Sequence, residues 1–337
     1  MGESTFKKIL GSGLTSDLGL ALLSPVLPRC ANILMLHRFA MPDLGVAGHQ
    51  PEMLRRHLEY LRARDYDLLA LPDLLDQIEK RVPFSRRTVV FTVDDGYVDF
   101  AEVGAPIFAA FDCPVTVFLI TDFVSGKLWN WFDKVLWIVS HSPRPGIDID
   151  IAGRTLNLRW RDASDRVVAY EALVEELKLI PDEEKESKLV TIARTLETDL
   201  PSTVPSADRA MSWDDVRRCA RGGVTYGPHT VTHPILSRVD GARAEREITE
   251  SWRTVAANTD AAVPVFCYPN GGVRDFSDRE RRAVQRAGMR SALTTIEGSV
   301  GCRGSVDPFA LPRYPYEEER TAFLQIVSGL TAARTSS

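Results

Sequence analysis

The chain has 337 residues, a net charge of −5 at neutral pH and a hydrophobic content of 44%. These values are typical of a compact soluble protein, and no dense basic run supports nucleic-acid binding. Its five cysteines are widely spaced and include no Cys-x-x-Cys pair. This pattern argues against a disulfide framework and a thiolate zinc site, and it favours a reducing compartment.

Residues 1–30 are interpreted as an N-terminal helix. Their apolar stretch, Leu18 to Pro28, is too short to span a bilayer and is interrupted by Pro25. It also lacks a clear small-residue cleavage site. We therefore predict a cytoplasmic protein, with an uncleaved signal or contact with a membrane surface as the alternatives for this helix.

From residue 31 onward, strand and helix patterns alternate. Thr88–Val93 is β-branched or aromatic throughout, as expected of a strand buried on both faces. Residues 127–210 interrupt the alternation with a hairpin pattern around Gly153 and a charged helical stretch. Further strands are expected at 31–36, 115–120, 223–226 and 263–268, and helices at 51–64, 72–80, 103–111, 241–258 and 278–287.

This order predicts one α/β domain, a distorted (β/α) barrel, over residues 31–318. A hairpin-plus-helix insertion is placed at about 127–210, and a C-terminal helix and tail at 319–337.

Two carboxylates and two imidazoles are the first candidates for chemistry. Asp94 and Asp95 directly follow the 88–93 strand, and barrel enzymes keep their chemistry at such strand ends. In His229-Thr-Val-Thr-His233, a helical turn would bring both imidazoles to one face, within reach of one cation. Two His and one carboxylate leave coordination positions open, and the Asp pair offers the missing ligand and a neighbouring base. Taken separately, the two elements are also compatible with a turn and a chance spacing.

These elements resemble motifs of the polysaccharide deacetylase family, the carbohydrate esterases built on the nodulation-protein-B homology domain. Thr92-Val-Asp-Asp-Gly96 matches the first motif and His229-Thr-Val-Thr-His233 the second. The resemblance covers roughly residues 33–314 apart from the insertion. It implies a barrel of this family's type, Asp94 as catalytic base, and Asp95, His229 and His233 as ligands of a divalent metal, zinc first, then cobalt or nickel.

Two family positions differ in this chain. In the third motif, Cys267-Tyr-Pro-Asn-Gly271, Cys267 occupies the place of an arginine, and Arg313 is the candidate to replace that arginine beside Asp94. Leu311-Pro-Arg-Tyr314 lacks the family's histidine, which acts as general acid. His37 ends the first strand and resembles the signature of family members whose barrel is circularly permuted, which implies that His37 is the acid.

The third motif also supplies candidate substrate contacts. Tyr268, Pro269 and Asn270 are expected to line the acetyl site, with the backbone N–H of Asn270 donating to the developing oxyanion. A plain turn is the alternative. Tyr97 and Asp99 are expected to organise the loop that follows Asp95.

The combined prediction is a metal-dependent hydrolase that removes N-acetyl groups from an amino-sugar polymer or oligosaccharide. Its expected partner is an N-acetylated carbohydrate. Two alternatives stay open. One is an O-acetyl esterase or deformylase acting on a sugar conjugate, and the other is a non-catalytic sugar-binding module that has lost its acid.

Overall fold

The computed structural model describes residues 17–23, 26–301 and 306–334, and a sheet of parallel strands forms its centre. The β3 strand is buried along its whole length, as its β-branched sequence predicts, and lies between β1 and β4. The sheet order is β10-β1-β3-β4-β7, and β2 also pairs with β3. These strands are β1 (Ala31–Leu36), β2 (Asp67–Leu68), β3 (Thr88–Val93), β4 (Val115–Leu119), β7 (Val224–Pro228) and β10 (Tyr314–Pro315).

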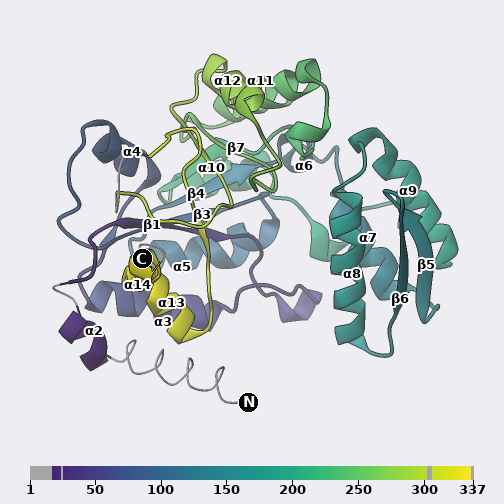
Figure 1. Cartoon of the computed structure of the whole chain (residues 1–337), viewed down its shortest axis with the longest axis horizontal. Helices are drawn as coiled ribbons and strands as arrows, with labels where there is room; N and C mark the ends of the chain where they lie inside the picture. Colours follow the sequence, from purple (N-terminus) through teal and green to yellow (C-terminus); the bar gives the residue numbers. More distant parts are fainter. Residues whose placement is uncertain (1–16, 24–25, 302–305, 335–337) are drawn as a thin grey trace.

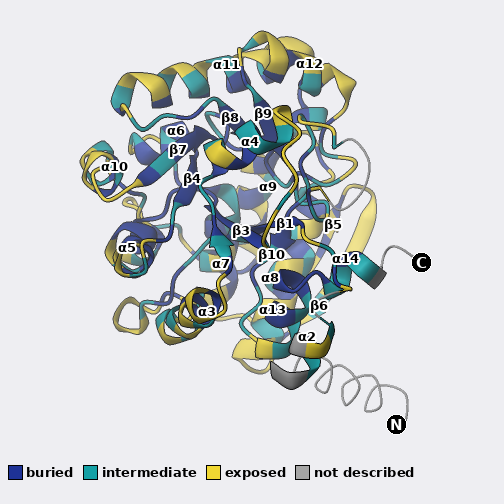
Figure 2. Cartoon of the chain, turned by 90° about the vertical axis from the view of Figure 1, so that its left-hand side faces the viewer, coloured by how far each residue is buried: buried dark blue, intermediate teal, exposed yellow. Residues whose placement is uncertain are grey.

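Helices cover both sides of this sheet. In Figure 1, α3, α5, α13 and α14 lie below the strands and α11 and α12 above them. Figure 2 shows the strands buried and the outer faces of α11 and α12 exposed, as amphipathic helices require. The helices are α2 (Asp17–Leu23), α3 (Pro51–Ala63), α4 (Leu71–Glu79), α5 (Ala105–Ala110), α6 (Thr121–Val124), α10 (Trp213–Ala220), α11 (Gly241–Asn258), α12 (Asp278–Arg286), α13 (Arg320–Val327) and α14 (Leu330–Arg334).

A second, two-stranded parallel sheet joins β8 (Val265–Cys267) to β9 (Ser291–Leu293). Single parallel bridges link Tyr226 to Ala262 and Leu293 to Leu311, so this small sheet lies between β7 and the segment before β10. The predicted α/β fold with parallel strands is confirmed. The strands therefore follow one another in the order expected around a distorted barrel. Closure of the strands into a complete barrel stays a prediction.

The predicted hairpin-plus-helix insertion is present as a lobe on the right of Figure 1. Its apolar cluster, which includes Leu173, Leu189 and Trp160, is separate from the clusters around the sheet. Ala152 and Gly153 take positive φ angles in the hairpin turn, a conformation that suits glycine. The lobe consists of α7 (Trp131–His141), β5 (Gly146–Ile151), β6 (Arg154–Arg159), α8 (Ala163–Leu177) and α9 (Asp182–Thr195).

The N-terminal prediction lies partly outside the described residues, which include only α2 from this region before residue 26. Within the described part of the chain, no helix combines the length and apolarity needed to cross a membrane. Cytoplasmic location and contact with a membrane surface stay predictions from the sequence. The cysteines of the described ranges are buried and form no disulfide.

Candidate active site

The carboxyl ends of neighbouring strands bring the first candidate residues together. Leu36 of β1 pairs with Val93 of β3, and Leu119 of β4 pairs with Pro228 of β7. His37, Asp94 and His229 are the residues that follow β1, β3 and β7. Because the strands are parallel and in register, these side chains meet at one edge of the sheet.

A sharp turn separates the two adjacent carboxylates. Asp95 and Gly96 both adopt left-handed backbone conformations, with φ of 75° and 89°. A side chain at Gly96 would begin 2.7 Å from a methyl group of Leu119, so only glycine fits there. As a result, the carboxylates of Asp94 and Asp95 have different partners.

Asp94 is paired with Arg313 in the interior. The two terminal nitrogens of the guanidinium each donate to one oxygen of Asp94 at 2.8 Å, and both side chains are almost inaccessible, at 0% and 3%. Burial alone would raise the pKa of Asp94, but the Arg313 charge and its hydrogen bonds hold this pKa well below its usual range. Arg313 also donates to the backbone oxygen of Thr294 at 2.8 Å, which fixes its orientation. Asp94 is therefore an oriented, ionised carboxylate.

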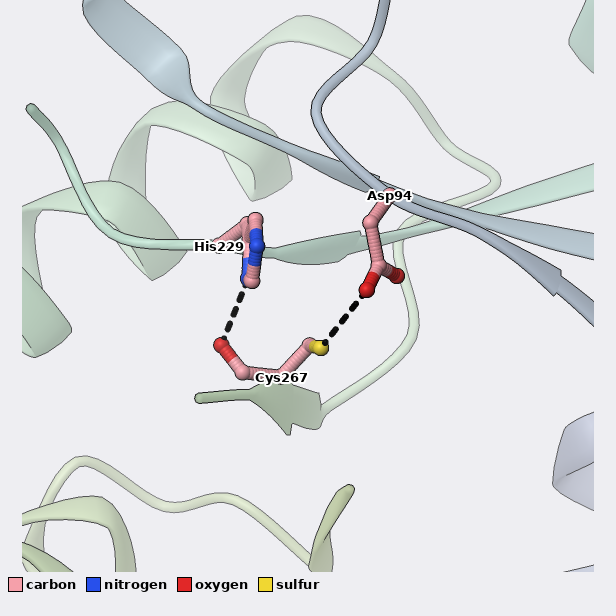
Figure 3. Close-up of side chains that lie close together, drawn as sticks. All are labelled: Asp94, His229 and Cys267. Atoms are coloured by element: carbon pink, nitrogen blue, oxygen red, sulfur yellow. Dashed lines mark hydrogen bonds between the residues drawn. The ribbon is translucent and has the colours of Figure 1, made fainter. Parts of the chain in front are cut away.

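Asp95 converges with the two histidines of the second motif. Its Oδ1 lies 3.6 Å from Nε2 of His229 and 3.7 Å from Nε2 of His233, and the two Nε2 atoms are 3.2 Å apart. The Nδ1 of His229 is 2.8 Å from the backbone oxygen of Cys267, and this contact is drawn in Figure 3. If that nitrogen carries the proton, Nε2 has a free electron pair directed toward the other two ligand atoms.

This donor set fits a divalent cation. Burial lowers the pKa of His229 to about 4 and that of His233 well below its usual value, so both imidazoles are neutral and able to coordinate. Burial, and then the neighbouring Asp94, raises the pKa of Asp95 well above its usual value. A carboxyl group without a cationic partner of its own, beside two neutral imidazoles, suits the Asp-His-His chemistry of zinc, cobalt or nickel sites.

A second group of potential ligands, Asp94, His229 and Cys267, is less suited to hold a metal. The Cys267 thiol lies 3.6 Å from Asp94, its contact in Figure 3, and 3.1 Å from a guanidinium nitrogen of Arg313. Burial raises the pKa of this thiol well above its usual value. A protonated thiol is a poor ligand, because metals bind the thiolate.

The His-x-x-x-His segment is not helical, contrary to the sequence-based expectation. It lies in the loop after β7, where Thr230 and His233 have positive φ angles of 69° and 59°. The buried Glu247 of α11 holds this loop, because its carboxylate accepts hydrogen bonds from the backbone N–H groups of Val231 and Thr232 at 2.8 and 2.9 Å. Tertiary contacts therefore bring the two imidazoles together.

His37 lies beside the Asp94 carboxylate. Its Nε2 is 3.9 Å from Oδ2 of Asp94, and its side chain remains 45% exposed toward the large cavity at this edge of the sheet. Partial loss of water lowers the pKa of this imidazole, against the attraction of Asp94. The neighbouring Arg38 and Phe39 are fixed by Asp99, whose carboxylate accepts from Nε of Arg38 at 2.6 Å and from the N–H of Phe39 at 2.9 Å. Asp99 thus connects the first-motif region to the end of β1.

The third-motif residues form a tight turn beside the histidines. Asn270 has a positive φ of 58°, and its backbone oxygen accepts a hydrogen bond from the Thr295 hydroxyl at 2.5 Å. Within the described ranges its N–H has no hydrogen-bond acceptor. Tyr268 stacks on Phe276 and donates its hydroxyl to the backbone oxygen of Phe309, so most of its ring serves packing. Asn270 and Tyr268 reach the cavity, whereas Pro269 is absent from its lining.

These residues form the floor of a cavity of about 910 Å³, which extends to the lobe. Asp133 of α7 lines it and was not found from the sequence. Its Oδ2 accepts from the hydroxyl of Tyr97 at 2.6 Å and from the side-chain N–H of Asn130 at 3.3 Å. Burial, together with the nearby Asp208, raises the pKa of Asp133 to about 7. The one available signal was a carboxylate among the apolar residues at the start of α7.

Comparison with known proteins agrees with the motifs. A family model described as polysaccharide deacetylase matches residues 184–292, a segment that contains His229 and His233. No curated protein matches the chain in sequence.

Several solved structures share the fold. The Streptococcus pyogenes deacetylase PplD in complex with acetate has a TM-score of 0.57 at 14% identity, covering 90% of this chain and 98% of its own. IcaB from Ammonifex degensii has a TM-score of 0.56 at 12% identity, with the same coverage. A de-N-acetylase from Aggregatibacter actinomycetemcomitans reaches 0.51 at 14% identity and covers 86% of this chain and 95% of its own.

The fold and the family model both indicate a hydrolase of the deacetylase type. Residues 184–292 are thus similar to the polysaccharide deacetylase family, and the fold of the chain is similar to that of solved deacetylases. Its resemblance to the circularly permuted members stays a prediction that rests on His37.

Proposed function

We propose that the protein is a metal-dependent hydrolase that removes N-acetyl groups from the amino sugars of a polysaccharide or oligosaccharide. One observation carries this proposal: a carboxylate held ionised by a buried arginine lies next to a second carboxylate that converges with two neutral imidazoles. The fold shared with a de-N-acetylase and with a deacetylase that holds acetate supports an acetamide as the bond cleaved.

Asp95, His229 and His233 are the proposed metal ligands, and zinc is the first candidate because borderline metals favour this donor set. A divalent cation held there would polarise the acetamide carbonyl and lower the pKa of nearby water. The roles of the protein's own side chains follow from their positions around this group.

Asp94 is the proposed general base. Arg313 keeps it ionised and fixes both of its oxygens, so the carboxylate is ready to take a proton from the attacking water. Asp94 is a weak base because of this pairing, and it depends on a water molecule that the site has made more acidic. Arg313 is a positioning residue, since its contacts are with the carboxylate and the protein around it.

His37 and Asn270 complete the proposed reaction. His37 is exposed to the cavity beside Asp94, and its protonated form would donate a proton to the departing amine as the carbon–nitrogen bond breaks. The free N–H of Asn270 lies at the cavity surface and would donate to the oxygen of the tetrahedral intermediate. The products are acetate and a free amino sugar.

The test is acetate release from N-acetylated and O-acetylated sugars with zinc, cobalt or a chelator. Asp94→Asn should lower kcat by about 10²–10⁴-fold, the usual contribution of a general base. Metal binding should persist, because Asp94 is outside the proposed ligand set. Asp260→Asn, at an exposed carboxylate, is the matched control and should retain activity.

Three outcomes would contradict the proposal. They are acetate release that survives complete removal of metal, full turnover by Asp94→Asn, and release from O-acetyl sugars alone. The last would identify an esterase.

A further inference from the structure

The cavity above the proposed metal site combines two kinds of lining. Its floor is polar and holds the proposed catalytic and metal-binding residues. The wall supplied by the lobe is largely apolar and includes Trp131, Leu136 and Trp137 of α7, and Tyr170 and Val174 of α8. Figure 1 shows α7 and α8 on the side of the lobe nearer the sheet, with β5 and β6 on its outer side.

The loop after β1 supplies a second apolar side to this mouth. Leu44 and Val46 line the same cavity. Leu44 and Leu136 are 39% and 38% exposed, which makes them two of the large apolar side chains left open to solvent. A single exposed leucine needs no explanation, but several apolar side chains at the mouth of one cavity indicate a ligand-binding surface.

We propose that this mouth binds an apolar carrier attached to the N-acetylated sugar, so that the substrate is an amino-sugar conjugate of the glycolipid type. This inference rests on the proposed function and names the form in which the sugar is presented. The sugar would lie over Asp94 and the metal ligands, with its hydrocarbon portion between Leu44 and α7.

Stacking of sugar rings explains only part of the wall, because each tryptophan has at most one face left for a sugar and the leucines and Val174 have no ring to stack on. The ring of Trp137 stacks on His141 with centroids 3.7 Å apart, and its Nε1 donates to the backbone oxygen of Asp199. The ammonium of Lys185 lies 4.7 Å from the centroid of the Trp131 ring. The leucines and Val174 offer contact to hydrocarbon and no hydrogen bonds to hydroxyl groups.

The size and charge of the cavity agree with such a substrate. Its volume of about 910 Å³ lies in the upper part of the range of about 300–1,000 Å³ found for small-molecule sites. A sugar with an apolar group of moderate length would therefore fit within it. Lys178, the lysine of this wall, is paired with Glu175 at 2.7 Å, which reduces the charge that a hydrocarbon would meet.

The test compares the methyl, butyl and hexyl β-glycosides of N-acetylglucosamine with the di- and trisaccharides of the same sugar. Each buried methylene should raise kcat/KM by about two- to fourfold, since its transfer from water is favourable. We expect the hexyl glycoside, with five more methylenes, to exceed the methyl glycoside by at least about thirtyfold on that basis. A ratio within twofold, together with a rise for the trisaccharide, would overturn the inference in favour of a polymer site.

Variants of the apolar residues show where the alkyl group of the glycoside binds. Leu44→Ser and Leu136→Ser should each lower the hexyl-to-methyl ratio of kcat/KM, and the double variant should lower it further. Val168→Ser is the matched control, because Val168 lies on α8, is 62% exposed and is not part of the cavity lining. An unchanged ratio in the double variant would place the alkyl effect elsewhere.

A binding measurement separates this inference from the proposed function. Calorimetry with Asp94→Asn and the hexyl glycoside should show a negative heat-capacity change, and Leu136→Ser in that background should bind several-fold more weakly. Acetate release with no alkyl dependence would refute the carrier and leave the deacetylase intact. Alkyl-dependent binding without metal-dependent release from any sugar would refute the deacetylase proposal.

Discussion

The ion pair between Arg313 and Asp94 gives a quantitative test of how the site is held together. Arg313→Met keeps an unbranched side chain in place but leaves the Asp94 carboxylate buried without its cationic partner. The variant also removes the hydrogen bond to the backbone oxygen of Thr294. Breaking a buried pair in this way usually costs about 3–5 kcal/mol, and we expect a loss of this size in the free energy of unfolding.

The assay is urea unfolding with a chelator present, so that metal binding does not contribute to the measured stability. The dependence on urea should stay the same, which makes the midpoints comparable. Arg290→Met is the matched control. Its partly exposed guanidinium pairs with Asp76 at 2.7 Å, and such surface pairs contribute about 1 kcal/mol or less.

Two further variants separate charge from geometry. Arg313→Lys keeps the charge but loses the two-pronged contact, so its stability should lie between those of the wild type and Arg313→Met. Asp94→Asn combined with Arg313→Met should be more stable than the sum of the single effects predicts, with a coupling of about 2 kcal/mol. Additive effects, or a loss below about 1 kcal/mol for Arg313→Met, would refute the strong coupling inferred for this buried pair.

Three other predictions address the loop, the core and pH. Glu247→Gln should weaken zinc binding by about 10- to 100-fold in a chelator competition, because the amide lacks the negative charge and the second oxygen, which accepts from the Thr232 hydroxyl of the histidine loop. An unchanged affinity would contradict this role. Gly227→Ala should destabilise the fold by about 3 kcal/mol in urea unfolding, since the new Cβ would lie 2.5 Å from the backbone oxygen of Val265. The control Gly126→Ala, with open space around it, should lose only about 1 kcal/mol. Burial lowers the pKa of His57 to about 4, so stability should fall from about pH 6.5 to pH 4 by up to about 3 kcal/mol. His57→Gln should flatten that part of the stability profile, and an unchanged pH dependence would show that other groups cause it.

Local sequence was sufficient to predict the central strand and the position of its carboxylates. Thr88–Val93 is apolar or β-branched at every position, so its strand structure depends little on distant contacts. Asp94 directly follows it, and a parallel strand delivers that residue to the edge where β1 and β7 also end. Strand positions were therefore enough to place His37 and Asp94 at strand ends, whereas the motif resemblance linked them with His229.

The shape of the histidine loop was beyond local reasoning. A spacing of four residues favours a helical turn, but the positive φ angles at Thr230 and His233 are stabilised by Glu247, which comes from another helix. From the sequence alone, Glu247 is indistinguishable from the other charged residues of an amphipathic helix. Asp133 was missed for a similar reason, because its position at the cavity depends on how the lobe packs against the sheet.

The origin of Arg313 in the C-terminal part of the chain has a consequence for biosynthesis. Asp94 is translated long before residue 313 exists, so the growing chain contains the carboxylate without its cationic partner. Burying an ion alone is costly, and the nascent strand end will therefore stay hydrated or protonated until β10 can pair with β1. Domains usually fold from the N-terminus as they are made. We instead expect the active site of this protein to mature only after residue 313 has been synthesised.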